Sequence, residues 1–472
     1  MATIIQAGKL ITAEVTMIAD IMIENEKIIA IGTHLPIQAN DVVFNAQGKC
    51  ILPGGVDVHT HFDLPMFGTV SSDDHYTGHR AAAFGGTTTV IDFVPQDVSP
   101  LISNVELWQK KAQPKAAIDY GFHMNITHLD AQVEKEIPRL LEVGICSVKV
   151  FTAYNDRLRL SDGDIFKVMR IARDYGLLVM VHAEQGDVID VLVYEALIAG
   201  HTSPEWHALT RPAEGEVESV FRTIMLAKMA QSPVYIVHMN TTAGVACVRW
   251  AREQGLPVMG ETCPHYMFFH GEHLKRTDAS KWICSPPIRT PFDNKGIIDG
   301  LMDNSLQVIG TDHCAFFYNG SKPIMYEGEP IAIPGKELGL NDFTKIPNGL
   351  PGVGDRIPVL WTNLVGKELI SKNQFVALNC TNPAKIFGLY PRKGTIMPGS
   401  DADIVIWDPM KEVNYGLEYA HHRTDHNLYE GWHLKGFVEK VFLRGNLIVD
   451  GSEWLGEKGM GNYINRSNPT II

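Results

Sequence analysis

Possible metal ligands occur at five separate places in this chain. Each place lies at or just beyond the end of a short run rich in β-branched residues: GGVDVHTHFD, SVKVFTAY, LLVMVHAE, PVYIVHMN and LQVIGTDHC. The candidate ligands in these runs are His59, His61, Lys149, His182, His238 and Asp312. Residues i and i+2 of a strand point to the same face, so His59 and His61 can bind one ion together. Imidazoles and carboxylates suit zinc and similar metals.

A single His-x-His pair would be weak evidence. The chain has 19 histidines, and a histidine at a strand end is often a hydrogen-bonded structural residue. Five strand ends that each offer a ligand are difficult to explain by chance. The pattern therefore predicts a metal site.

The number of ligands favours two ions. Four histidines, one carboxylate and one lysine exceed the four ligands of a tetrahedral zinc, so two metals that share a bridge fit better. A protonated lysine is no ligand, but desolvation and two nearby cations would lower the pKa of Lys149 and favour the free amine. That amine can add carbon dioxide and become a carbamate (N6-carboxylysine) with one oxygen for each metal. A salt-bridged surface lysine is the alternative, and it fits poorly because Lys149 lies within the apolar run SVKVF.

Such a pair of metals predicts hydrolysis. Two metals would lower the pKa of a bridging water and polarise a bound carbonyl. Asp312 can then accept the proton of the attacking hydroxide and pass it to a leaving nitrogen. Tyr154, five residues after Lys149, is a candidate donor to the developing oxyanion, and an ordinary half-buried aromatic residue is the alternative.

The elements that carry these residues recur at regular intervals. Candidate strands begin near positions 56, 87, 118, 147 and 178, spaced 29 to 31 residues apart, and further strands follow near 233, 256 and 306. About 30 residues is the length of a βαβ unit, so eight such units over residues 53–387 predict an α/β fold of the (β/α)8 TIM-barrel type. The ligands then fall at the carboxyl ends of strands, where these barrels place their chemistry. A doubly wound open sheet is the alternative, but no glycine-rich phosphate loop follows the first strand.

The two ends of the chain have similar sequence patterns. Residues 1–52 and 388–450 both contain short alternating strands with turn glycines, which predicts one small β-sandwich domain built from both ends. The tail, residues 451–472, has little core of its own, and we expect it either to fray or to pack on a neighbouring subunit. A long Gly- and Pro-rich loop follows Cys314, and both an active-site lid and a disordered excursion remain open for it.

Composition narrows the partners. The hydrophobic content of 45% describes a globular protein with an ample core, and the net charge of −13 argues against nucleic acid or an anionic membrane as partner. The start of the chain does not resemble a signal peptide, and no apolar run approaches membrane-spanning length. The seven cysteines are odd in number and include no C-x-x-C pair, as in reduced proteins. A cytoplasmic location is therefore expected.

Nine segments in order resemble the cyclic amidohydrolases, and among these the D-hydantoinases and dihydropyrimidinases most. They are PGGVDVHTHFDLP, SVKVFTAYN, VMVHAEQGD, YIVHMN, GETCPHY, CSPPIR, IGTDHC, FTKIPNGLPGVGDR and KGTIMPGSDADIVIWDP, and they extend over nearly the whole chain. The resemblance implies two Zn²⁺ ions, with other divalent metals as alternatives. It puts His59, His61 and Asp312 on one ion and His182 and His238 on the other, with carboxylated Lys149 and hydroxide as bridges.

The resemblance also implies how a small cyclic ureide is bound. Tyr154 takes the oxyanion role, main-chain groups of Ser285 and Asn348 hold the ring amide, and Leu64, Phe151 and Leu158 match the family's substrate-gate loops. The expected assembly is a homotetramer. Two departures stand out: the loop after Cys314 is longer than expected, and the segment AYNDRLRLSDGD is polar where relatives are often aromatic.

The expected reaction is zinc-dependent hydrolysis of the cyclic amide bond of 5-substituted hydantoins or dihydropyrimidines, giving N-carbamoyl amino acids. Another ring-opening enzyme, an allantoinase or a dihydroorotase, is the first alternative. Dihydroorotases resemble this chain but carry an arginine two residues after the second histidine, where Asp63 stands here, and we expect this acid to disfavour an anionic ring. A non-catalytic scaffold resembling the dihydropyrimidinase-related proteins is the second alternative, and the complete ligand set argues against it.

Overall fold

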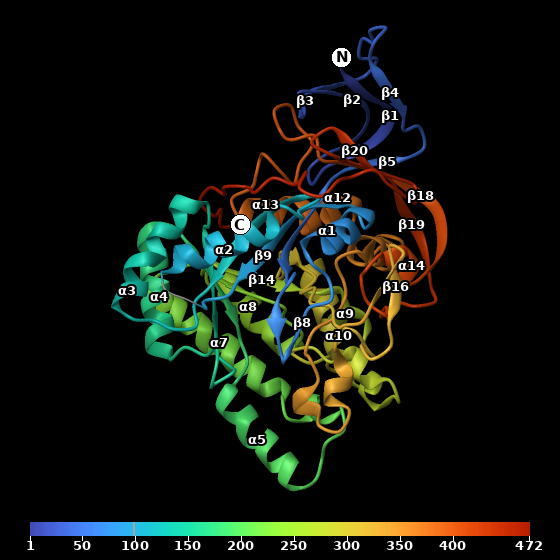
Figure 1. Ribbon diagram of the computed structural model, residues 1–472. Helices are drawn as coiled ribbons and strands as arrows, with labels where there is room; N and C mark the ends of the chain where they lie inside the picture. Colours follow the sequence, from blue (N-terminus) through green and yellow to red (C-terminus); the bar gives the residue numbers. More distant parts are fainter. Residues whose placement is uncertain (98–99) are drawn as a thin grey trace.

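The computed structural model describes residues 1–97 and 100–472, and at its centre lies a sheet of eight parallel strands (Figure 1). These strands are β6 (Gly55–Thr60), β9 (Thr87–Val94), β10 (Asp119–Asn125), β11 (Ser147–Phe151), β12 (Leu178–His182), β13 (Val234–Ile236), β14 (Val258–Thr262) and β15 (Val308–Ile309). Their order in the sheet follows the chain from β6 to β15. A parallel bridge between Thr60 and His313 joins the first strand to the segment after the last. The predicted (β/α)8 barrel is confirmed, with strands at all eight expected places.

Helices alternate with the barrel strands. They are α1 (His75–Phe84), α2 (Leu101–Ala112), α3 (Ala131–Glu136), α4 (Asp162–Tyr175), α5 (Gly186–Ile198), α6 (Trp206–Leu209), α7 (Ala213–Ala230), α8 (Thr242–Glu253), α9 (Pro264–Phe268) and α10 (Pro291–Met302). Short helices at α11 (Arg356–Leu360), α12 (Lys372–Val376) and α13 (Asn382–Ile386) follow the last strand.

Helix α4 illustrates why these segments are helical. Ser161 caps its amino end by accepting a hydrogen bond from the main chain of Asp164, and Gly176 ends it in a left-handed conformation. The side chains of Ile165, Val168, Met169 and Ala172 are buried at helical spacing. This apolar stripe fixes the helix against the barrel.

A buried arginine ties the amino-terminal end of the barrel together. The Arg356 side chain is fully buried and donates hydrogen bonds to the carbonyls of Val56 (3.0 Å) and Ile309 (2.8 Å) and to the hydroxyl of Thr87 (3.0 Å). It thereby links the amino ends of the first and second strands to the short last strand. The closure fixes where the carboxyl ends of these strands lie relative to one another.

Both chain ends contribute to one mixed sheet beside the barrel (Figure 1). From the amino end come β1 (Thr3–Ile11), β2 (Thr16–Glu24), β3 (Lys27–Gly32), β4 (Val42–Asn45) and β5 (Cys50–Pro53), and from the carboxyl end β18 (Ile404–Tyr415), β19 (Trp432–Leu443), β20 (Asn446–Asp450) and β21 (Glu453–Trp454). The β5–β18 pair joins the two sets, with Leu52 opposite Val405. A β domain built from both ends is confirmed.

The tail packs on its own barrel. Ile464 is buried, the hydroxyl of Tyr463 donates to the carbonyl of Val143 (2.7 Å), and the main-chain NH of Asn462 donates to Asp119 (2.8 Å). The guanidinium of Arg466 reaches the hydroxyl of Ser147 (3.0 Å). The expectation of a frayed tail is wrong, because the start of β10 and β11 offers polar partners that the sequence does not reveal.

The long loop after Cys314 is folded. It contains the hairpin of β16 (Ile324–Tyr326) and β17 (Glu329–Ile331), followed by 3₁₀ turns at Lys336–Gly339 and Phe343–Lys345. Glu327 pairs with Arg80 of α1 (2.8 Å), which fastens the hairpin to the barrel. A disordered excursion is therefore excluded. Within the described ranges we find no helix with the length and apolarity to cross a membrane.

Candidate active site

The predicted ligands converge at the carboxyl end of the barrel strands. His59 lies in β6, Lys149 in β11 and His182 at the end of β12, while His61, His238 and Asp312 lie just beyond β6, β13 and β15. Asp312 Oδ1 is 3.0 Å from His59 Nε2 and 3.2 Å from His61 Nε2. These three residues form a group whose possible ligand atoms all lie within 4.8 Å of one another.

The remaining ligands adjoin this group. Lys149 Nζ lies 2.9 Å from His59 Nε2, and His182 Nδ1 lies 2.9 Å from His238 Nε2. The rings of His59 and His238 are 5.4 Å apart, centroid to centroid. Lys149 therefore lies beside the group of His59, His61 and Asp312, and the pair His182 and His238 lies next to that group. A site for two neighbouring metal ions requires this arrangement.

Burial sets the charges of this cluster. It lowers the pKa of Lys149 to about 8, although Asp312 and Glu261 favour the charged form. It also lowers the pKa of His182 and of His238, so that both imidazoles are neutral at physiological pH. Burial opposes ionisation of Asp312 too, but its contacts with His59 and His61 outweigh this and hold its pKa well below the ordinary value. The pKa of His59 is raised instead, because its contacts with Glu261 and Asp312 outweigh burial and the nearby Lys149. Metal binding requires a neutral amine, neutral imidazoles and a carboxylate, and the shifts at Lys149, His182, His238 and Asp312 favour these forms.

Two buried glutamates orient the histidines. Glu261 Oε1 lies 2.6 Å from His59 Nδ1, and Glu184 Oε2 lies 2.8 Å from His182 Nε2. When each glutamate accepts the ring proton, His59 Nε2 and His182 Nδ1 are left as acceptors that face the interior of the cluster. His182 Nδ1 lies next to His238 Nε2, and His59 Nε2 lies next to Asp312 Oδ1, so a cation placed among these atoms would find several acceptors directed at it. The donor set therefore fits a divalent metal site.

Three residues of the site adopt left-handed backbone conformations. The φ angle is +64° at Tyr154, +39° at His238 and +49° at Asp312. Left-handed backbone conformations are unfavourable for residues other than glycine and occur mainly where the surrounding structure imposes them. Here they turn the chain directly after a strand, and so direct side chains over the barrel mouth.

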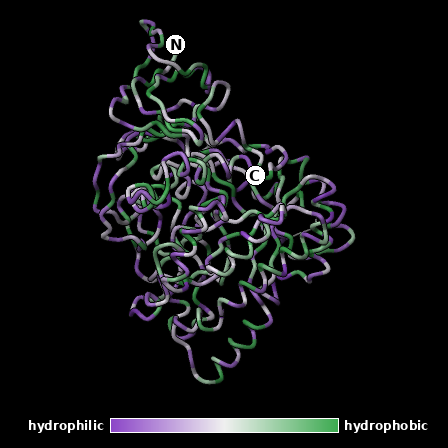
Figure 2. Tube along the Cα trace, turned by 180° about the vertical axis from the view of Figure 1, so that it is seen from behind, coloured by the Kyte–Doolittle hydropathy of each residue, from purple (hydrophilic) through white to green (hydrophobic). Residues whose placement is uncertain are grey.

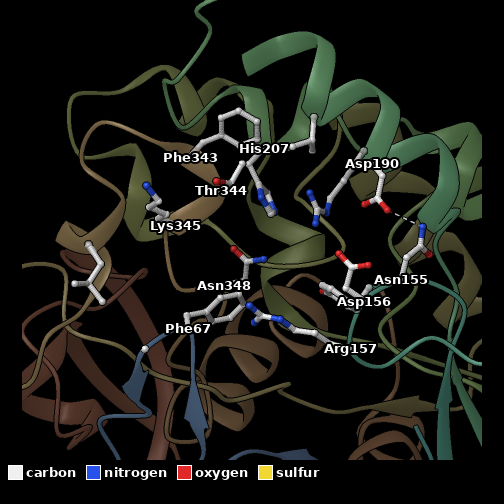
Figure 3. A pocket seen from close by; sticks show the side chains of 15 residues that line it. Phe67, Asn155, Asp156, Arg157, Asp190, His207, Phe343, Thr344, Lys345 and Asn348 are labelled. Atoms are coloured by element: carbon white, nitrogen blue, oxygen red, sulfur yellow. Dashed lines mark hydrogen bonds between the residues drawn. The ribbon is translucent and has the colours of Figure 1, made fainter. Parts of the chain in front are cut away.

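A cavity of about 540 Å³ opens next to the ligands (Figure 3). Tyr154 and Asn348 line it, and the Tyr154 ring lies 5.2 Å from that of His182. Ser285 joins the two, since its hydroxyl accepts a hydrogen bond from the Asn348 side chain (3.1 Å) and interacts with the Tyr154 hydroxyl. Burial raises the pKa of Tyr154 above its ordinary value, which keeps the phenol a donor.

The predicted gate residues lie outside this wall. Among the described residues that line the cavity, Leu64, Phe151 and Leu158 are absent. Leu64 and Phe151 are buried, and the Phe151 ring lies 5.8 Å from that of His182. Phe67 and Gly68, at the tip of the hairpin of β7 (Pro65–Met66) and β8 (Thr69–Val70), line the cavity instead. A role of the three predicted residues in gating remains a prediction.

Comparison with known proteins gives the family. Residues 50–448 match the model of the amidohydrolase family. This chain belongs to that family. It is 42% identical to a D-hydantoinase of Streptomyces coelicolor over 98% of both chains. A crystal structure of a D-hydantoinase superposes with a TM-score of 0.95 at 42% identity over 99% of each chain, and one of a dihydropyrimidinase from Brevibacillus agri with 0.94 at 41% identity over the full length of both.

These similarities place the amidohydrolase among the cyclic amidohydrolases of the hydantoinase and dihydropyrimidinase type, as the sequence motifs predict. The protein is therefore an enzyme, and the alternative of a non-catalytic scaffold is set aside.

The structure gives Asp63 partners that the sequence did not reveal. The Asp63 carboxylate pairs with Lys115 (3.0 Å), and its carbonyl accepts a hydrogen bond from Lys111. A φ of +52° turns the chain at this residue, and Asp63 does not appear among the described residues that line the cavity. Asp63 is therefore paired with a lysine outside the cavity lining, and its effect on an anionic ring remains a prediction.

Sequence reasoning missed the roles of Glu184 and Glu261. Both lie in quoted motifs, two residues after His182 and at the start of GETCPHY. Burial disfavours ionisation of Glu184, yet its contacts with His182 and Arg211 hold its pKa at about 2. For Glu184 the available signal was an acid two residues after a candidate ligand, whereas Glu261 lies on β14, which carries no candidate ligand.

Proposed function

We propose that this enzyme hydrolyses the cyclic amide bond of 5-substituted hydantoins or dihydropyrimidines and releases N-carbamoyl amino acids. The observation that carries the proposal is the convergence of all six candidate ligands beside a cavity walled by Tyr154 and Asn348. The names of the similar proteins, D-hydantoinase and dihydropyrimidinase, support the same substrate class.

Two zinc ions are proposed as the resident metals. His59, His61 and Asp312 would hold one and His182 and His238 the other, with Lys149 as N6-carboxylysine between them. The lowered pKa of Lys149 supports this modification, because only the free amine adds carbon dioxide. When bound, the metals lower the pKa of water and polarise the amide carbonyl.

The protein groups then have separate tasks. Main-chain groups of Ser285 and Asn348 bind the ring amide and orient it. The Tyr154 hydroxyl donates a hydrogen bond to the carbonyl oxygen as this oxygen gains negative charge. Asp312 accepts a proton from the attacking water and delivers it to the ring nitrogen as the C–N bond breaks, leaving a carboxylate and a carbamoyl nitrogen.

The test is a substrate panel with zinc-loaded protein. Hydantoin, dihydrouracil, allantoin and dihydroorotate are compared by kcat/KM, and metal content is measured on the same preparation. We expect about two zinc ions per chain and the highest values for hydantoins or dihydrouracil. Allantoin or dihydroorotate as the best substrate would refute the proposed substrate class, and full activity without metal would refute the proposed cofactor.

We also propose that the enzyme is a cytoplasmic homotetramer. Helix α5 projects from the barrel (Figure 1), and hydrophobic residues along it appear as green stretches of the trace in Figure 2. Val188, Val191, Tyr194 and Ile198 are 42%, 55%, 66% and 69% exposed. An apolar stripe of this kind is typical of a protein–protein contact, and a second copy of the chain is the proposed partner. Any part played by residues 451–472 in that assembly is limited to side chains not engaged with the barrel.

A further inference from the structure

The cavity beside Tyr154 has a charged wall. Its lining includes three cations, Arg157, Arg211 and Lys345, and two carboxylates, Asp156 and Asp190 (Figure 3). The protein as a whole has a net charge of −13, so an excess of cations at this place is a local feature. If the ring is bound between Tyr154 and Asn348, these charges face the substituent of the ring.

Most of these charges already have partners. Asp190 accepts a hydrogen bond from the Asn155 side chain (2.6 Å), Arg211 lies 3.8 Å from Glu184, and Lys345 lies 3.2 Å from Asp342. Arg157 differs from these residues. Within residues 1–97 and 100–472, its guanidinium makes no ion pair, unlike those of Arg159, Arg211 and Arg289.

The direction of Arg157 connects it with the reaction site. Figure 3 shows its side chain extending across the cavity toward Phe67 and Asn348, whereas Asp156 lies on the side of Asn155. Lys345 stands on the opposite wall. The backbone NH of Arg157 donates to the carbonyl of Tyr154 (3.0 Å), so this arginine is fixed to the same turn as the proposed oxyanion donor.

We propose that Arg157 selects cyclic ureides whose 5-substituent ends in a carboxylate, with Lys345 as a second, weaker contact. This inference rests on the proposed function and names its substrate class. A guanidinium binds a carboxylate through two parallel hydrogen bonds, which gives both affinity and direction. A cavity of about 540 Å³ has room for a ring with a short chain. Phe67 and Phe343 also line it, so an aromatic substituent is the competing occupant.

The experiment compares two isosteric substituents, one charged and one neutral, and an aromatic substituent on the hydantoin ring. The specificity constant kcat/KM of the zinc-loaded enzyme is measured for 5-(2-carboxyethyl)hydantoin, for its neutral amide 5-(2-carbamoylethyl)hydantoin and for 5-benzylhydantoin. We expect the carboxylate to be favoured over the amide by about 10-fold or more, in keeping with a charge-assisted hydrogen bond. Raising the salt concentration should reduce this ratio, because the wall is open to solvent.

Two variants assign the preference. Arg157→Gln should remove most of the preference for the carboxylate over the amide, mainly through a higher KM for the carboxylate, and leave only the weaker contribution of Lys345. Arg159→Gln is the matched control, because this arginine is two residues away but is engaged with Asn155 and Asp187 and is not part of the cavity wall. It should keep the ratio of the parent enzyme.

The outcomes separate the two proposals. Hydrolysis of the neutral rings with no gain from the carboxylate, or with 5-benzylhydantoin as the best substrate, overturns the role of Arg157 and leaves the proposed function intact. An equal ratio in Arg157→Gln and the parent does the same. If none of these rings, nor hydantoin or dihydrouracil, is opened by the metal-loaded enzyme, the proposed function fails and the specificity proposal fails with it.

Discussion

Lys336 is a buried lysine that should make the stability of this enzyme depend on pH. It lies in the long loop after Cys314, is 1% exposed, and donates hydrogen bonds to the carbonyls of Ile283 (3.1 Å) and Pro347 (2.9 Å). Burial lowers its pKa from 10.5 to about 7, and the neighbouring thiols Cys284 and Cys314 offset only part of this. The substitution that tests it is Lys336→Met, which keeps the aliphatic chain and removes the amine.

The direction of the pH dependence follows from the number of protons that the folded and unfolded chains bind. Between about pH 7 and pH 10.5 the unfolded chain holds the proton of Lys336 and the folded chain does not, so the free energy of unfolding rises with pH in this window. Below pH 7 both states are protonated, and the cost of the buried charge is fully present. The difference between 10.5 and about 7 corresponds to roughly 5 kcal/mol, with a slope of about 1.4 kcal/mol per pH unit.

The assay is urea unfolding of zinc-saturated protein at fixed concentration between about pH 6.5 and 9.5. Relative to Lys336→Met, the parent enzyme should gain roughly 3 kcal/mol of unfolding free energy across this range. Lys322→Met, at an exposed lysine of the same loop, is the control and should follow the parent. A constant difference between parent and Lys336→Met at every pH would refute the reasoning. Lys336→Met should also have a higher KM. The carbonyls that Lys336 holds, those of Ile283 and Pro347, lie close in sequence to Ser285 and Asn348, the proposed substrate contacts.

Three further predictions concern the metal site and the assembly. Lys149→Ala should lose bridging metal and nearly all activity, with partial rescue by short-chain carboxylic acids; full metal content and turnover in this variant would show that Lys149 is no bridge. Asp312→Asn should fold normally and lose a factor of about 10²–10⁴ in kcat. Metal analysis of the variant distinguishes the loss of the proton acceptor from the loss of zinc. A near-normal kcat would contradict the role of Asp312 in proton transfer. The double variant Val191→Asp/Ile198→Asp should have a lower mass by light scattering than the parent enzyme, whereas Glu195→Ala on the same helix should keep the parent mass. A monomeric parent enzyme would contradict the proposed tetramer. An unchanged mass in the double variant would exclude α5 as the subunit contact.

Local patterns determined the barrel and its metal ligands. The spacing of strand starts from Val56 to Leu178 and the position of each ligand at a strand end are properties of short segments, and the structure has strands at these places. Because parallel strands in one ring bring their carboxyl ends together, the convergence of His59, Lys149 and Asp312 followed from the fold class. The family, too, is indicated by short motifs alone, since each motif is a contiguous run of residues.

Only the tertiary structure decided which side chains face the cavity. Asp63 and Arg157 both follow a barrel strand by a few residues, yet Asp63 turns away to Lys115 and Arg157 lies in the cavity wall. The tail could not be placed from its own residues, since its partners at Asp119 and Ser147 are distant in sequence. The physical reason is the same in each case: a strand fixes side-chain direction by alternation, whereas in a loop or tail the direction depends on contacts with residues far along the chain.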